Sequence, residues 1–212
     1  MDHAIGLIVP VAGQGTFPNV WKFLYSLPVT DKTEFFLIDT LGIYSGGIKG
    51  PIKKVIKRKG YIPVGALEIK MPNTFLKKIE SKIKDTEILS KANDNLNSFI
   101  FELINSKAKW SDIPIYSDIL SIFFRTKTMT KIWNKFFKKN ITIKCIECSI
   151  CKNVCPEKCF IDEEKHIDIN SKDCILCQRC LEFCPVNAIQ LNNKNYIKNN
   201  RYKYNEFRQY IL

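Results

Sequence analysis

The chain has 212 residues, of which 45% are hydrophobic and 25% are charged. This length and balance are typical of a globular protein with one ordinary domain or two small ones, and they exclude a disordered or collagen-like chain. The formal net charge is +12. Such a charge leaves nucleic acid, an anionic membrane surface and an acidic protein open as partners.

The chain has no apolar run long enough to span a membrane. Its longest run, residues 4–12, contains Pro10 and is better interpreted as a buried strand. A secretory signal begins with a basic region, and this N-terminus has no early Lys or Arg. We therefore expect a cytoplasmic protein without a membrane span, in which grouped cysteines are metal ligands rather than disulfides.

The first 72 residues alternate short apolar runs with helical patterns. Asn19 is a candidate N-cap for the first helix, and Gly60 is expected to end the second helix. Strands that alternate with helices of this length predict a parallel α/β sheet. The predicted strands are 5–10, 34–39 and 61–69, with helices over 20–27 and 47–59.

The segment that follows, residues 74–109, has a helical pattern. Within the preceding helix, residues 53–59 are strongly basic. On a helix between strands such charges usually form a solvated outer face, and no motif for reading bases accompanies them. We therefore expect no nucleic-acid partner.

All nine cysteines lie between Cys145 and Cys184, so the composition changes sharply near residue 140. They form the same pattern twice, and each cysteine of the second copy follows its counterpart by 29 residues, as 174 follows 145. The two copies are Cys145-x2-Cys148-x2-Cys151-x3-Cys155-Pro156 and Cys174-x2-Cys177-x2-Cys180-x3-Cys184-Pro185. Zinc sites seldom use three cysteines at successive x2 spacing.

This run is the signature of bacterial ferredoxins, in which the fourth cysteine ligates the other of two clusters. Applying the crossed rule predicts one [4Fe–4S] cluster on Cys145, Cys148, Cys151 and Cys184. It predicts a second cluster on Cys174, Cys177, Cys180 and Cys155.

The ninth cysteine, Cys159, aligns with Ala188 in the second copy. A position that holds alanine in the sister copy needs a small side chain and not a ligand. We therefore predict that Cys159 is a small buried residue beside a cluster.

Residues 143–190 thus resemble a bacterial-type two-[4Fe–4S] ferredoxin domain. The resemblance implies a compact pseudo-twofold unit with short hairpins, two short helices and one-electron transfer at low potential. Residues 162–169, between the two copies, are expected to form a surface hairpin.

Residues 4–72 resemble the later part of a flavodoxin-like domain. The resemblance rests on two predicted strands and the loops that follow them, residues 12–18 and 41–47. The whole chain therefore resembles the family of flavodoxin-like/ferredoxin fusions. That resemblance implies an FMN site with Tyr44 stacked on the flavin ring. The residues implied around the flavin are Gly13, Gly15, Gly42, Tyr44 and Gly46.

The chain departs from flavodoxins because nothing before Ala4 supplies their first strand and its phosphate-binding loop. The segment Gly13-Gln-Gly15-Thr16 is either a substitute loop or a simple strand–helix turn. Two explanations stay open: a partner completes the site, or the domain is a docking scaffold without flavin.

The expected fold class is α/β: an incomplete flavodoxin-like parallel sheet with added helices, followed by a small α+β two-[4Fe–4S] ferredoxin domain. The expected domains are 1–72 for the sheet, 73–140 for a helical extension or linker, 141–192 for the ferredoxin domain and 193–212 for a basic tail.

We expect an electron-transfer protein that passes single low-potential electrons through two [4Fe–4S] clusters to or from a partner oxidoreductase. The alternatives are a flavin- and iron–sulfur-dependent reductase and an electron-delivery subunit of a larger complex. The sequence offers no acid–base pair, so a carrier or redox subunit is favoured over a stand-alone enzyme. Residues 141–190 are net acidic and the flanking regions are net basic, which predicts a redox partner that is acidic at the contact.

Overall fold

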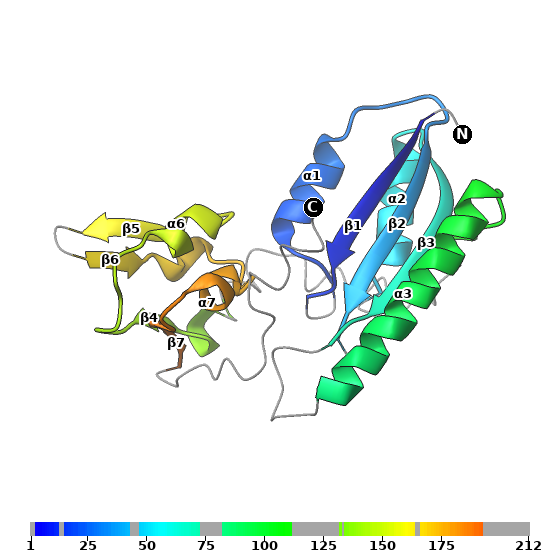
Figure 1. The fold of residues 1–212 in the computed structure, drawn as a ribbon. Coiled ribbons are helices and arrows are strands. Elements are labelled where there is room, and N and C mark those ends of the chain that lie inside the picture. The colour runs from blue at the N-terminus through cyan, green and yellow to red at the C-terminus, as the bar shows by residue number, and fades with distance from the viewer. Residues whose placement is uncertain are drawn as a thin grey trace. The chain divides into compact units, whose positions relative to one another are not determined.

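The computed structural model describes residues 3–12, 15–42, 47–72, 82–111, 132, 134–163 and 166–192. The chain forms two compact units, which we name the N-terminal unit (Met1–Thr126) and the C-terminal unit (Lys127–Leu212). Figure 1 labels the helices and strands of both.

The N-terminal unit contains a sheet of three parallel strands in the order β1-β2-β3. These strands follow the three apolar runs of the sequence, which confirms the predicted parallel α/β arrangement. Their bounds are β1 Ala4–Pro10, β2 Glu34–Leu41 and β3 Ile62–Lys70. The prediction that the first run forms a buried strand is wrong: this strand lies at one end of the described strand order, and most of its residues are exposed.

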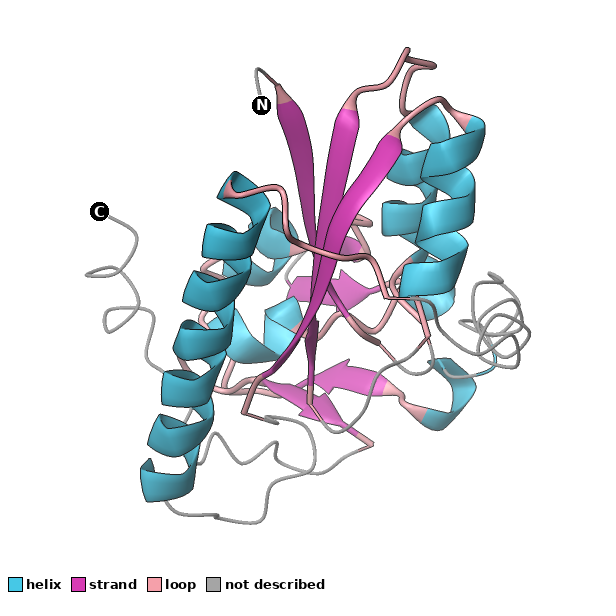
Figure 2. Cartoon of the chain, turned by 90° about the vertical axis from the view of Figure 1, so that its right-hand side faces the viewer, coloured by secondary structure: helices cyan, strands magenta, loops and turns pink. Residues whose placement is uncertain are grey.

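Helices cover both faces of this sheet (Figure 2). Phe35 and Leu37 of β2 belong to a core with α1 and α2, whereas Phe36 and Ile38 face a second core with α3. Successive strand residues point to opposite faces, so one apolar run supplies both cores. The helix bounds are α1 Pro18–Ser26, α2 Lys49–Arg58 and α3 Lys82–Ile104.

The ends of the first two helices only partly follow prediction. The N-cap of α1 is Phe17, so the prediction of Asn19 as the cap is wrong. Pro18 occupies the first turn, where its fixed φ suits a helix and its missing N–H costs nothing. Gly60 follows α2 with a φ of +86°, as predicted, and a Cβ at this position would collide with the Thr30 carbonyl oxygen.

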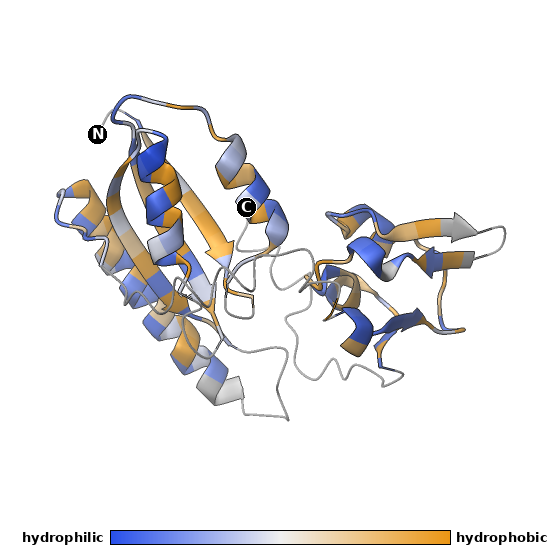
Figure 3. Cartoon of the chain, turned by 180° about the vertical axis from the view of Figure 1, so that it is seen from behind, coloured by the Kyte–Doolittle hydropathy of each residue, from blue (hydrophilic) through white to orange (hydrophobic). Residues whose placement is uncertain are grey.

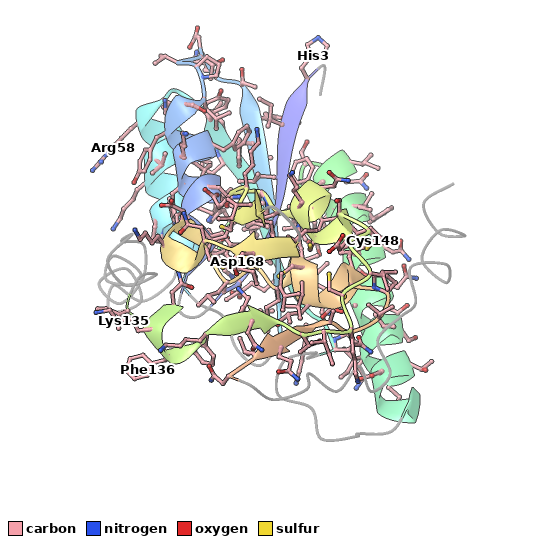
Figure 4. The ribbon with its side chains drawn as sticks, turned by 90° about the vertical axis from the view of Figure 1, so that its left-hand side faces the viewer. His3, Arg58, Lys135, Phe136, Cys148 and Asp168 are labelled. Atoms are coloured by element: carbon pink, nitrogen blue, oxygen red, sulfur yellow. The ribbon has the colours of Figure 1, made fainter. Side chains whose placement is uncertain are left out.

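The basic helix α2 presents two kinds of surface. Its apolar side is buried against the sheet, and the striping of hydrophobic and hydrophilic residues along the helices is visible in Figure 3. Lys54, Lys57 and Arg58 are exposed, and Arg58 points away from the sheet (Figure 4). Lys53 and Lys59 instead donate to backbone carbonyls of Trp110 and Leu27. The predicted solvated outer face is confirmed for the three exposed residues.

The predicted helical segment 74–109 contains α3, while residues 73–81 lie outside the described residues. Within the described part of the chain, none of the helices combines the length and apolar character that a membrane span needs.

Within its described residues, the C-terminal unit contains two antiparallel strand pairs, a short helical stretch at residues 134–136 and two further short helices, α6 and α7, which pack against each other. β4 pairs with β7, and β5 pairs with β6, which confirms the hairpin predicted between the two cysteine copies. The bounds are β4 Lys139–Ile141, α6 Ile150–Val154, β5 Phe160–Glu163, β6 His166–Ile169, the 3₁₀ turn η1 Ser171–Asp173, α7 Arg179–Phe183 and β7 Ile189–Leu191.

The two halves of this unit repeat each other in hydrogen bonding as well as in sequence. The Thr142 N–H donates to the Ala188 carbonyl at 2.8 Å, and the Asn170 N–H donates to the Cys159 carbonyl at 2.8 Å. Between the halves lies one core of Phe160, Ile167, Leu181, Ala188 and Ile189. Each half therefore contributes equivalent elements to a shared interior.

Candidate metal centres

The cysteine loops have an unusual backbone that repeats between the copies. Glu147 and Ser149 have φ of 53° and 57°, and their counterparts Leu176 and Gln178 have φ of 57° and 61°. Left-handed conformations are uncommon for non-glycine residues. Alternated with right-handed ones, they turn successive backbone N–H groups to one side, which is the geometry of many anion and iron–sulfur sites. The backbone of both loops is thus suited to a negatively charged group.

The first loop lines one of two cavities of nearly equal size. This cavity, which we name the Cys145 cavity, has about 340 Å³ of empty space, part of it open to solvent. The cysteines in its lining are Cys145, Cys148 and Cys151 from the first copy and Cys184 from the second.

The second loop lines the other cavity, the Cys174 cavity, which has about 350 Å³ of empty space, part of it open to solvent. The cysteines in its lining are Cys174, Cys177 and Cys180 from the second copy and Cys155 and Cys159 from the first. Each predicted set of four ligands therefore lies around one cavity. Four predicted cysteine ligands around each cavity suit an iron–sulfur cubane, because thiolates are the ligands of such clusters.

The cysteines of the two cavities differ in their access to water. Cys180 and Cys184 are buried, and Cys148, labelled in Figure 4, is the exposed one among the nine. Its counterpart Cys177 is only partly exposed. The lining of the Cys145 cavity therefore includes the most exposed of the nine cysteines.

Backbone N–H groups donate to the fourth cysteine of each set. The Cys159 N–H donates to Cys155 Sγ at 3.3 Å, and the Ala188 N–H donates to Cys184 Sγ at 3.2 Å. Cys159 is 4% exposed, so the prediction that it is buried is confirmed. Because cysteine and alanine perform the same backbone role, this position does not need a sulfur; that Cys159 is not a ligand stays a prediction.

Burial raises the pKa of the Cys151, Cys177 and Cys180 thiols, to about 12 for Cys180. Neighbouring cysteines add to the increase in each case, whereas the positive charge of Lys139 opposes it at Cys177 and Cys180. Without metal these thiols stay protonated near neutral pH. Metal binding must displace their protons, so loading is favoured as pH rises.

Two residues before the first motif reach the second loop. Lys139 Nζ donates to Cys174 Sγ at 2.8 Å, and Asn134 Nδ2 donates to the Cys174 carbonyl at 2.6 Å. Sequence reasoning missed both residues, because it assigned residues 73–140 to a helical extension or linker. A basic residue shortly before a cysteine motif was the available signal.

The residues implied in an FMN site are only partly described. Gly13, Tyr44 and Gly46 lie outside the described residues, whereas Gly15 and Gly42 lie within them. Ala12 and Gly15 exchange two backbone hydrogen bonds, of 2.8 Å and 3.2 Å. Those two N–H groups are therefore engaged within the turn, and the FMN site stays a prediction.

A carboxyl pair that sequence reasoning missed lies at the carboxyl ends of the parallel strands. Asp39 of β2 is fully buried, and its register partner on β3 is Glu68, which pairs with Lys49 Nζ at 2.8 Å. Burial raises the pKa of Asp39 to about 7; the charge of Glu68 adds to the increase and that of Lys49 opposes it. The available signal was an acidic residue at the end of two successive apolar runs.

Comparison with known proteins agrees with the cysteine geometry. A family model described as a 4Fe-4S dicluster domain matches residues 138–200. Over 68 residues the chain is 40% identical to the pyruvate synthase subunit PorD of Methanothermobacter marburgensis, a match that covers 32% of this chain and 80% of that one. The chain belongs to the 4Fe-4S dicluster ferredoxin family.

Two further relatives are similar to the chain over 52 and 74 residues. The chain is 40% identical over 52 residues to Ferredoxin-1 of Caulobacter vibrioides, covering 24% of this chain and 46% of that one. It is 32% identical over 74 residues to NADH-quinone oxidoreductase subunit I 2 of Geobacter metallireducens, covering 30% of this chain and 55% of that one. The chain thus spans about half the length of these two relatives.

These matches confirm the predicted ferredoxin resemblance, and electron transfer is the function consistent with it. The family model concerns the C-terminal unit. The flavodoxin-like resemblance of residues 4–72 stays a prediction.

Proposed function

We propose that the chain passes single electrons through two [4Fe–4S] clusters between a low-potential donor protein and an acceptor oxidoreductase. The observation that carries this proposal is the pair of matched cavities, each lined by three cysteines of one copy and the fourth of the other. Bound clusters supply the one-electron chemistry, and the protein supplies ligation, spacing and surroundings.

The residues around the cavities suit this role. The N–H groups of Cys159 and Ala188 donate to ligand sulfurs, which stabilises added negative charge. The shared core between the halves keeps water from the inner side of both cavities. The exposed Cys148 brings one predicted ligand to the surface of the unit, where a partner can approach it.

Analysis of iron, sulfide and flavin in anaerobically purified full-length protein tests the cofactor content. We expect about eight irons and about eight sulfides per chain, four of each for every cubane, without stoichiometric flavin. A colourless protein with zinc as its only metal would contradict the proposal.

The crossed ligand sets are tested by two matched substitutions, Cys184→Ala and Cys155→Ala. We expect Cys184→Ala to remove the cluster of the Cys145 cavity and Cys155→Ala to remove that of the Cys174 cavity, each with about four irons. The measurement is NMR of the contact-shifted cysteine β-protons, assigned to each loop. Loss of the same-copy cluster in either variant would show that the ligand sets are not crossed.

For the N-terminal unit we propose the later part of a flavodoxin-like sheet that serves as a docking body. The order β1-β2-β3 of its parallel strands agrees with the last three strands of the flavodoxin order 2-1-3-4-5. Among the described strands, β1 lies at an edge of this sheet, and its Ile8 is 67% exposed. Such an edge leaves room for a further strand or a partner surface.

A second candidate function is electron delivery as a subunit of a larger oxidoreductase. Two relatives have names that make them subunits, one of pyruvate synthase and one of NADH-quinone oxidoreductase. The net charge of +12 favours a partner that is acidic at the contact. Purification of the tagged chain from its source at low salt should retain an oxidoreductase that is released at high salt, and recovery of the chain alone at low salt would favour a free carrier.

A further inference from the structure

The strand register makes the two cavities comparable residue by residue. Ile141 pairs with Ile189, and Ile169 pairs with Phe160, which is the counterpart of Ile189 in the cysteine repeat. Ile141 and Ile169 are therefore equivalent. Two residues earlier on the same strands, Lys139 is equivalent to Ile167.

This equivalence reveals a charge difference between the cavities. Lys139 lines the Cys174 cavity, and Ile167 lines the Cys145 cavity. Lys139 Nζ lies 2.8 Å from Cys174 Sγ, and its charge also acts on the Cys177 and Cys180 thiols. At the same place in the fold, one site has a cation in contact with a ligand sulfur and the other has an aliphatic side chain.

We infer that Lys139 makes the Cys174 cavity the preferred site of the transferred electron, giving its cluster the higher reduction potential of the two. The inference rests on the proposed function. A low-potential one-electron donor adds one electron and no bond forms or breaks, so the site gains one negative charge. A cation that donates a hydrogen bond to a ligand sulfur stabilises that charge.

Other differences between the cavities are weaker or act in the opposite direction. Glu157 lines the Cys174 cavity where Val186 lines the other, and its negative charge opposes Lys139. Water reaches Cys148 more than its counterpart Cys177, which favours reduction at the Cys145 cavity. Neither effect involves a full charge in contact with a ligand sulfur, so the effect of Lys139 is expected to prevail.

The inference gives the electron a direction through the protein. The exposed Cys148 allows entry at the Cys145 cavity. Lys139 then favours transfer to the Cys174 cavity, from which the acceptor takes the electron.

The test is an anaerobic reductive titration of the cluster-loaded full chain with dithionite, followed by NMR of the contact-shifted cysteine β-protons of each loop. When one electron has been added to the wild type, we expect it to occupy the cluster of the Cys174 cavity about ten times as often as the cluster of the Cys145 cavity. This ratio corresponds to a difference in reduction potential of about 59 mV for a one-electron couple. Lys139→Ile should lower this ratio about tenfold, and the double variant Lys139→Ile/Ile167→Lys should place the excess on the Cys145 loop. Lys139→Arg, which retains the charge, should keep the wild-type order.

Iron content distinguishes a failure of the inference about Lys139 from a failure of the proposed function. If the Lys139→Ile variant keeps both clusters and also keeps the wild-type electron distribution, the inference is overturned and the proposed function is left intact. Absence of a second cluster in the wild type would overturn the proposed function itself. If Lys139→Ile does not load, Lys139→Gln serves as the neutral variant.

Glu157→Gln is the matched control for charge in the same cavity. It removes the opposing charge and should shift the electron further toward the Cys174 loop. A Lys139→Ile effect no larger than that of Glu157→Gln would contradict the specific role of the lysine contact.

Discussion

Replacement of the buried Asp39 by asparagine should make the N-terminal unit less sensitive to pH. Asp39 is fully buried, and neither of its carboxylate oxygens has a hydrogen-bond partner among the residues that the structure describes. Burial raises its pKa from 3.8 to about 7. Between these values the folded protein holds a proton that the unfolded chain has lost. The stabilisation is therefore complete below pH 3.8 and is lost as pH rises through about 7.

The size of the effect follows from the difference between the two pKa values. The increase is about three units, and each unit corresponds to about 1.36 kcal/mol, so the free energy of unfolding changes by about 4 kcal/mol across this pH range. An asparagine stays neutral throughout. Asp39→Asn should therefore match the wild type near pH 4 and exceed its free energy of unfolding at pH 8, by about 2–4 kcal/mol.

Denaturant unfolding followed by tryptophan fluorescence measures this difference. Trp21 and Trp110 are 4% and 8% exposed in the core of the N-terminal unit, so their emission reports on its unfolding. Asp31→Asn, at an exposed position, is the matched control and should leave the pH profile unchanged. The free energies of unfolding of the wild type and of Asp39→Asn could instead differ by the same amount at pH 4 and pH 8. That result would show that Asp39 is ionised in the folded protein.

Three further substitutions test other features of the structure. Cys159→Ala should retain about eight irons per chain, because its counterpart is Ala188; loss of a cluster in metal analysis would identify Cys159 as a ligand. Gly60→Ala should lower the free energy of unfolding by about 1–3 kcal/mol, because φ is +86° and the Cβ collides with the Thr30 carbonyl. Both free energies are measured by urea titration, with Gly15→Ala as the control, because a Cβ at Gly15 meets no atom within 4 Å. An equal loss of unfolding free energy in the two variants would refute the reasoning. Asn134→Ala removes the donor to the Cys174 carbonyl and should speed iron release from that cavity to a chelator; an unchanged rate would show that this contact does not anchor the loop.

The parallel sheet and the shape of the C-terminal unit could be predicted because their signals are local. Each strand is a short apolar run, and each cysteine loop has fixed spacing. The mistake at Asn19 was also local: Pro18 was available as a first helical residue, and its conformational preference determined where α1 begins.

The electrostatic features could not be predicted, because they depend on pairing between distant segments. Aligning the cysteines shifts the copies by 29 residues, which places Lys139 opposite Asp168. The strand register instead makes Lys139 equivalent to Ile167. Likewise, the closeness of Asp39 and Glu68 follows from the register of β2 with β3. Neither register has a local signal in the sequence.

The crossed lining of the cavities has a consequence for the order in which the protein is made. During synthesis the first loop emerges with three of the cysteines of its cavity, and Cys184 follows Cys151 only 33 residues later. The second loop, in contrast, finds Cys155 already present. The Cys174 cavity therefore has all its cysteines once Cys180 has emerged, and the Cys145 cavity is completed last. With the proposed crossed ligand sets, neither half of the C-terminal unit would mature as a separate module.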